Sequence, residues 1–261
     1  MNWNRVYAIF LRHLYFLRRS YDRISDTFYW ITLDLVIWGI TGIYFQRFSP
    51  DAQYVVFMII SGVLLWNITW RAQIEISLGT IEELYNKNLV NLFVSPLTFR
   101  EWVTGLVIMG AGKAIISFLF GTIIAFFFYH VGIFQYSYHL PVLFVLLIMS
   151  GWWIGFLIAS FILRYGTRVQ TLAWSFTWLL SPFSAIYYPL EILPKWAQTI
   201  SYFIPMSYVF EEGRNLLYNG AVDYNKLLIS FGLNILYLVL TLWLFRSSFK
   251  SVLDKGLVKV Y

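Results

Sequence analysis

The sequence contains no cysteine, and only 12% of its 261 residues are charged. The missing thiols exclude disulfide bonds, thiolate catalysis and cysteine-based metal sites. Soluble domains carry about twice this share of charged residues, so the chain cannot cover a folded core with a water-solvated surface. Because 59% of the residues are hydrophobic, the composition indicates an all-α integral membrane protein.

Motifs for catalysis and nucleotide hydrolysis are also missing. Residues 110–114 (GAGKA) come nearest to a phosphate-binding loop, but the first glycine and the Ser or Thr of GxxxxGK[ST] are both replaced. There is no HExxH pair and no GxSxG turn, and His13, His130 and His139 fall on separate segments. We therefore predict no catalytic residue, no metal site and no cofactor bound by this chain.

Residues 2–19 precede the first long apolar run and have a helical period. Apolar side chains recur at spacings of four and three, and arginines lie opposite them: the first set is Trp3, Tyr7, Phe10, Leu14 and Leu17, the second Arg5, Arg12 and Arg19. The pattern predicts an amphipathic helix within residues 1–26, lying in the membrane plane with its arginines at anionic headgroups. A signal peptide is the alternative, but the segment has no compact apolar centre and no small-residue cleavage site.

Six apolar segments follow, each near the roughly 20 residues that a membrane-spanning helix needs. They lie at about 27–45, 54–74, 104–130, 140–163, 169–188 and 226–246. With a cytoplasmic N-terminus, 15 of the 19 lysines and arginines fall on inner segments. The positive-inside rule therefore places both termini in the cytoplasm of a multi-pass protein of the cell (inner) membrane. The net charge of +6 is explained by this topology, and we predict no nucleic-acid partner.

A ridge of small residues marks the fourth apolar segment. Gly151, Gly155 and Ala159 recur at intervals of four, which lets another helix approach closely. The partner helix can belong to the same subunit or to a second copy.

The connection 75–103 is the only long inner one. Glu82 and Glu83 stand near the start of a short predicted helix, and Pro96 stops it. Because the helix mixes charges with apolar side chains, we interpret it as a docking helix for a cytoplasmic partner; a solvated connecting helix is the alternative. The residues assigned to this coupling role are Glu82, Glu83, Leu84, Tyr85, Lys87, Leu89, Leu92 and Phe93.

Asp34 lies about a third of the way into the first apolar segment. A carboxylate at such a depth costs roughly 2.5–3.5 kcal/mol on insertion scales unless it meets water or a partner. Two interpretations stay open. Asp34 pairs with an arginine of the N-terminal helix or of the loop between the fourth and fifth segments, or it lies at the inner mouth of a substrate path.

Four of the seven prolines lie between Ser181 and Arg214. Each removes a backbone donor, so a continuous helix is excluded, and the topology places residues 189–225 at the outer face as a re-entrant segment. One of its acids is expected to pair with Arg214; contact with an exported polar group is the alternative. The residues assigned to this outer gate are Pro189, Glu191, Pro194, Trp196, Pro205, Glu211, Glu212 and Arg214.

The order of residues in this outer segment resembles the signature of the ABC-2 family of ATP-binding-cassette transporter permeases. The similar pieces are residues 188–194 (YPLEILP), Trp196, residues 204–205 (IP) and the acid pair followed by Arg214. Residues 79–82 (GTIE) and 95–98 (SPLT) are similar to two parts of the family's inner loop, although about a dozen residues separate them here.

The resemblance implies a single transmembrane domain over residues 1–261 that works as a dimer, a homodimer in the simplest case. Two cytoplasmic ATPase subunits, which use ATP and Mg²⁺, would dock on the inner loops and N-terminal helices. The family exports glycans, glycolipids, lipids and drug-like molecules, and membrane lipids surround it. The alternative function is a self-contained secondary carrier or channel driven by an ion gradient through Asp34 and the outer acids.

Overall fold

The computed structural model describes residues 1–48, 52–86 and 95–254, and the regular structure within these ranges is entirely helical. The expected all-α class is thus confirmed. The α-helices are α1 (Trp3–Arg19), α2 (Tyr21–Gln46), α3 (Ala52–Tyr85), α5 (Phe99–Tyr129), α6 (Leu140–Tyr165), α7 (Leu172–Leu180), α8 (Lys195–Ser201), α9 (Pro205–Asn219) and α10 (Tyr224–Asp254). Short 3₁₀ helices are η1 (Ile133–His139), η2 (Gly166–Val169), η3 (Ser181–Phe183) and η4 (Leu190–Ile192).

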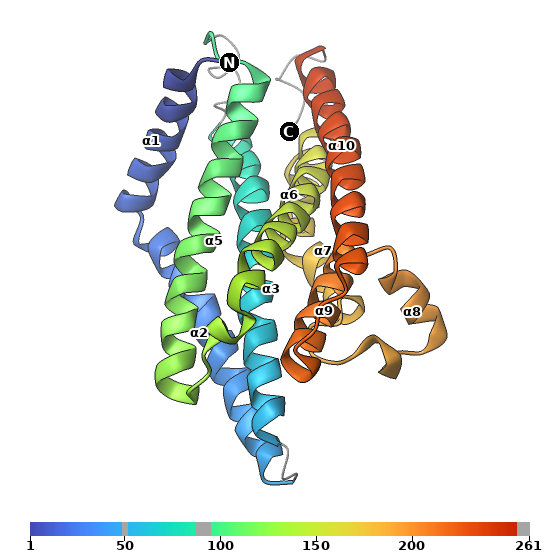
Figure 1. Ribbon diagram of the computed structural model, residues 1–261. Coiled ribbons are helices and arrows are strands. Elements are labelled where there is room, and N and C mark those ends of the chain that lie inside the picture. Colours follow the sequence, from blue (N-terminus) through green and yellow to red (C-terminus); the bar gives the residue numbers. More distant parts are fainter. Residues whose placement is uncertain (49–51, 87–94, 255–261) are drawn as a thin grey trace.

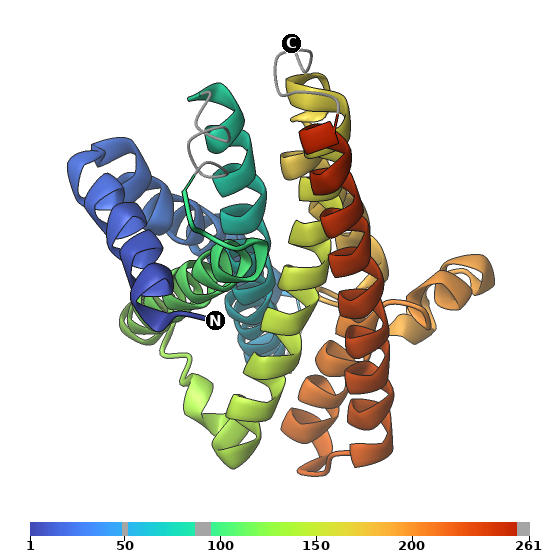
Figure 2. The same ribbon diagram turned by 90° about the horizontal axis from the view of Figure 1, so that it is seen from above.

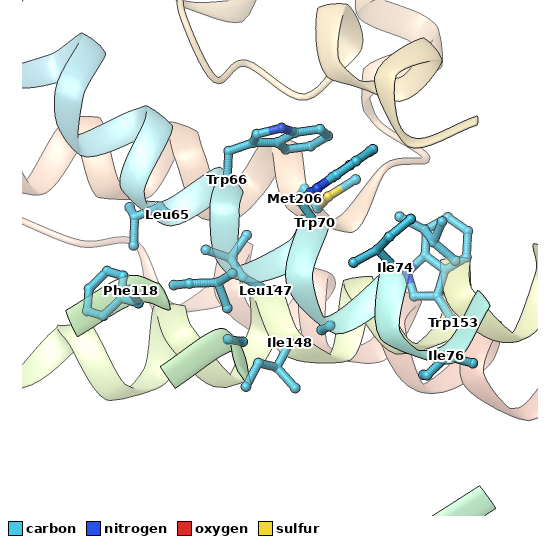
Figure 3. Packing of buried hydrophobic residues seen from close by; sticks show 14 of the residues in the cluster. Leu65, Trp66, Trp70, Ile74, Ile76, Phe118, Leu147, Ile148, Trp153 and Met206 are labelled. Carbon is cyan, nitrogen blue, oxygen red and sulfur yellow. The ribbon is translucent and has the colours of Figure 1, made fainter. Parts of the chain in front are cut away.

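The central helix of the bundle is α3 (Figure 1). It packs against α2 and α5 on one side and against α6 on the other, and α10 covers α6 (Figure 2). Figure 3 shows the packing around α3, where Phe118 of α5 and Leu147 of α6 meet Leu65. Burial of apolar side chains on several sides of one long helix explains why α3 has so few exposed positions along its length.

Five helices are long and apolar enough to cross a membrane: Tyr21–Gln46, Val55–Tyr85, Phe99–Tyr129, Leu140–Val169 and Tyr224–Val252. Five of the six predicted spans lie largely within these helices, so the multi-pass membrane class is confirmed. The structure differs at the remaining segment, 169–188, where α7 has nine residues and would cover only about 14 Å of a core some 30 Å thick. η3 follows it directly, with Pro182 as its second residue. The count of six spans therefore stays a prediction.

The helix of the second predicted span extends further than expected. We predicted that the span ends near residue 74 and that Glu82 and Glu83 start a separate short helix, but α3 continues to Tyr85, so both acids lie within it. The rest of the predicted short helix, from Lys87 to Phe93, lies outside the described residues. α3 can continue to this point because Glu82 and Glu83, which we assigned to a solvated loop, form ion pairs inside the protein. Their charges therefore do not need a loop that exposes them to water. Thr98 and Glu101 then start α5 with a capping box.

The small-residue ridge of α6 packs inside the subunit. A Cβ atom added to Gly151 would lie 2.5 Å from the carbonyl oxygen of Thr69 in α3, and one on Gly155 would lie 2.9 Å from the Cβ of Ile76. Ala159 is fully buried in the same core. Of the two partners left open above, the structure shows α3 of the same chain.

The N-terminal helix α1 lies obliquely beside α5 at one end of the bundle (Figures 1 and 2). At the side of the molecule, α8 and the chain around it stand out from the long helices. The orientation of both elements relative to a bilayer stays a prediction.

Candidate functional site

The end of α3 is tied to α1 and α2 by ion pairs. A guanidinium nitrogen of Arg12 lies 2.7 Å from the Glu83 carboxylate, and Arg23 forms an ion pair with Glu82. Glu83 is only 2% exposed. Two acids assigned to a partner-facing surface are therefore engaged inside the subunit, because a buried carboxylate requires a paired cation.

The neighbouring coupling residues divide into inner and outer faces. Leu84 is buried, whereas Tyr85 is 57% exposed and its hydroxyl donates to Gln170, between α6 and α7. This hydrogen bond joins the end of α3 to the short connection that precedes α7. The remaining coupling residues, Lys87, Leu89, Leu92 and Phe93, lie outside the described residues.

A second attachment of α1 lies at the start of α5. The Glu101 carboxylate accepts from the backbone nitrogens of Asn2 (2.7 Å) and Thr98 (2.9 Å). Arg5 lies 3.7 Å from the same carboxylate and also donates to the carbonyl of Pro96. Arginines that we expected at lipid headgroups thus bind acids of the same chain. Glu101 is almost fully buried, so its carboxylate needs these internal hydrogen bonds and the nearby arginine in place of water.

His13 is buried between these attachments, and its Nε2 has no hydrogen-bond partner within the described residues. Burial lowers the pKa of the imidazole below its ordinary value of 6.5. Arg12 and Arg23 also lower it, whereas the carboxylates of Glu75 and Glu83 act in the opposite direction. The neutral form of His13 is therefore the one that the folded protein favours.

Further ion pairs lie deeper in the bundle and were not predicted from the sequence. Lys113 of α5 and Glu75 of α3 are 2.6 Å apart, and Arg71 and Asp26 are 2.7 Å apart. Arg71 is 1% exposed and also donates to the Asp26 carbonyl. Charged residues inside long apolar helices, with Arg71 and Glu75 one turn apart, are the signal that could have indicated this layer.

Asp34 lies two turns after Asp26 along α2 and is half-buried. We expected an arginine of α1, or of the loop between α6 and α7, as its partner, but within the described residues it has no ion pair. Arg71 acts on Asp34 electrostatically, yet its guanidinium binds Asp26. One turn along α2 from Asp34, Trp38 stacks on Tyr187 at 4.3 Å between ring centroids.

Four tryptophans form an aromatic face between α3 and α7. Trp66 and Trp70 extend from one side of α3 (Figure 3), and Trp178 lies 6.2 Å and 5.8 Å from them, respectively, between ring centroids. Trp174 lies 6.4 Å from Trp70. The two α7 rings remain 40% and 42% exposed, so this face offers ring surface to a molecule outside the subunit.

The outer segment is held by a network around Arg214. One nitrogen of its guanidinium lies 2.6 Å from the Glu211 carboxylate and another donates to the carbonyl of Ala185 at 2.6 Å. The same Glu211 oxygen accepts from the nitrogen of Leu190 at 3.0 Å. The predicted pairing of Arg214 with one acid is present, and it ties α9 to the chain that follows η3.

The second acid of this region, Glu212, serves a different contact. It is fully buried and lies 2.8 Å from the ammonium group of Lys226 at the start of α10. Its other oxygen accepts from the backbone nitrogen of Asp223 at 2.8 Å. Glu212 therefore fixes the turn between α9 and α10.

The prolines of the outer segment stand where helices begin. Pro189 and Pro194 directly precede η4 and α8, and Pro205 is the first residue of α9. At these positions the backbone nitrogen makes no hydrogen bond within the helix, so the missing N–H of proline removes none. Glu191 and Trp196 are exposed, the latter by 63%. Their assignment to an outer gate stays a prediction.

These features define a class: a multi-pass membrane protein with buried ion pairs at the α1 end of the bundle, a proline-marked segment around α8, and an aromatic face between α3 and α7. Residues 32–246 match the family model described as "ABC-2 family transporter protein". Because the match covers most of the chain, the protein belongs to the ABC-2 transporter family and is a membrane component of an ABC transporter. No curated protein matches the chain.

Proposed function

We propose that the chain is the transport subunit of an ATP-driven exporter, in which two copies form the path and two separate ATPase subunits supply the energy. The observation that carries this proposal is the family match over residues 32–246. The substrate leaves the cytoplasm and belongs to the glycan, glycolipid, lipid or drug-like molecules.

The division of labour between permease and ATPase is supported by the chain itself. Residues 110–114, the nearest approach to a phosphate-binding loop, lie inside α5. Their backbone donors are used in helical hydrogen bonds and cannot surround a phosphate. ATP and Mg²⁺ are therefore handled by a partner chain.

Energy transfer at the α1 end is supported by the contacts of that helix. The connection 87–94 has α3 before it and α5 after it, and α1 is attached to both: Arg12 binds Glu83, and Arg5 binds Glu101. A partner that displaces this connection would move α1 with it. We therefore assign docking of the ATPases to this end, with Tyr85 as its exposed aromatic residue.

The test is reconstitution of the chain with each ABC-type ATPase of its source organism in turn. We expect a stable complex and ATP-dependent uptake of substrate into inside-out vesicles. The matched control is the same complex with the ATPase Walker B glutamate replaced by glutamine, which should bind ATP without supporting uptake.

Two results would overturn the proposal. One is the absence of a complex with the ATPase combined with unchanged transport after replacement of residues 87–94 by a Gly-Ser linker. The other is substrate flux in ATP-free liposomes that follows an imposed ion gradient, which would establish a secondary carrier.

A further inference from the structure

We propose that Asp34 anchors a binding site for an organic cation, namely an amphiphilic molecule with a protonated amine or quaternary ammonium group. This inference rests on the proposed function and names the chemical class of the transported substrate. The site combines one uncompensated carboxylate with aromatic rings from three parts of the chain.

The depth of Asp34 in the bundle follows from two contacts between α2 and α3. At one end Arg71 binds Asp26. At the other end α2 touches α3 at Gly42, where an added Cβ would lie 3.0 Å from a methyl group of Val56. The two helices are antiparallel. Along α2, Asp34 is midway between Asp26 and Gly42, so it lies opposite the middle of the α3 segment between Val56 and Arg71. This is the interior of a membrane span.

Aromatic rings converge at this level. Trp38 lies one turn from Asp34 on the same face of α2 and stacks on Tyr187, with an angle of 21° between ring planes. The segment that carries Tyr187 is held against α3, because the carbonyl oxygen of Ile186 would lie only 2.7 Å from a Cβ on Gly62.

The tryptophan face defined above continues this aromatic surface. Trp66 is one turn from Gly62 along α3, and Trp178 packs against it. Trp174 and Trp178 remain partly exposed, so a molecule can reach the rings from outside the subunit. Indole is the side chain that attracts cations most strongly over its ring face, and quaternary ammonium groups are recognised in this way.

The charges of the layer favour a cation over an anion. When ionised, Asp26, Arg71 and Asp34 together carry one net negative charge. The guanidinium of Arg71 forms its ion pair with Asp26, which leaves the charge of Asp34 without an ion pair. An ionised carboxylate inside a span is costly without a partner. A bound ammonium group would neutralise the excess charge, and its apolar part would cover the rings.

The experiment measures binding of benzyltrimethylammonium, a quaternary ammonium ion with one apolar ring, to the purified protein in nanodiscs by equilibrium dialysis, with empty nanodiscs subtracted. We expect saturable binding that Asp34→Asn weakens at least about tenfold, since it removes a partly desolvated charge pair. Asp34→Glu should retain affinity within roughly threefold. The matched control is Asp22→Asn, which makes the same change at an exposed position of α2.

A second variant separates the aromatic contribution from folding. Trp38→Phe keeps a ring and should lose less affinity than Trp38→Leu, while both elute as monodisperse species. Equal affinity of the wild type and Asp34→Asn, or no saturable binding by a monodisperse wild type, would overturn the site. Either result alongside an intact, ATP-hydrolysing complex would overturn the cation site alone. Cation binding without any ATPase complex would overturn the proposed function and leave the site standing.

Discussion

Arg12 of α1 and Glu83 of α3 form an ion pair of 2.7 Å that fastens the N-terminal helix to the end of the central helix. The carboxylate is almost fully buried, whereas the guanidinium is 41% exposed. Removing the cation takes away the counter-charge that this pair gives a buried carboxylate, while removing the carboxylate leaves an arginine that can turn to water. The two residues are therefore not equivalent in their effect on stability.

Replacing Arg12 by alanine should consequently destabilise the protein by roughly 1–3 kcal/mol, and combining it with Glu83→Gln should recover part of that loss. The midpoint of thermal unfolding in detergent reports both effects. Arg18→Ala, which removes an exposed arginine of the same helix, is the control and should leave the midpoint unchanged. A loss in Arg12→Ala that the second substitution leaves untouched would show that the pair is not the cause.

The Arg12–Glu83 pair also shows where sequence reasoning ends. Hydrophobic periodicity located α1 and most of the spans, because each apolar face has to be buried over several turns. Charges do not reveal their partners in this way. Glu83 was assigned to a docking helix because charges and apolar side chains are mixed around it, and only the folded chain brings Arg12 to it. Asp34 was singled out from its place inside an apolar run, and its role stays a prediction. The ring pair of Trp38 and Tyr187, one turn away, joins two distant segments, which periodicity cannot reveal.

The outer network predicts a graded response at Glu211. Its Oε1 accepts from both Arg214 and Leu190, and glutamine keeps an acceptor at that place while alanine does not. We expect Glu211→Ala to lower the yield of monodisperse protein several-fold and Glu211→Gln to lower it less, because an unsatisfied buried group costs about 1–3 kcal/mol. Size-exclusion chromatography measures the yield.

Exchanging the charges of Glu211 and Arg214 should restore folding only in part. An arginine at position 211 cannot accept from Leu190, and a glutamate at position 214 would face the carbonyl of Ala185. If the exchange restores full yield but not transport, one of the two charges contacts the substrate. Complete recovery of both would contradict the hydrogen-bond roles described here.

The contact of α6 with α3 predicts opposite effects of the same substitution at two glycines. Gly151→Ala places a methyl group 2.5 Å from the Thr69 carbonyl oxygen and should destabilise the protein by about 1–3 kcal/mol. Gly232→Ala in α10 meets nothing within 4 Å and should be neutral or stabilise by up to about 1 kcal/mol, since alanine favours helix. Thermal unfolding of the two variants, measured side by side, tests the ridge. An equal shift in both would argue against close packing at Gly151.

His13 predicts how stability depends on pH. Burial lowers the pKa of the folded protein's imidazole, with help from Arg12 and Arg23 and against the carboxylates of Glu75 and Glu83. The unfolded chain therefore binds a proton more readily than the folded one. The stability that the neutral imidazole contributes is fully present above about pH 6.5 and is lost as the pH falls through the lowered pKa.

Unfolding midpoints between pH 7.5 and 5 should accordingly fall more steeply in the wild type than in His13→Gln, which cannot titrate. His130→Asn is the matched control: His130 is exposed and ends α5 in the left-handed conformation, with a φ of 53°, which asparagine tolerates. This variant should keep the wild-type slope because it retains His13. If His13→Gln and the wild type lose stability in parallel, other groups carry the acid sensitivity and α1 is not held by a neutral histidine.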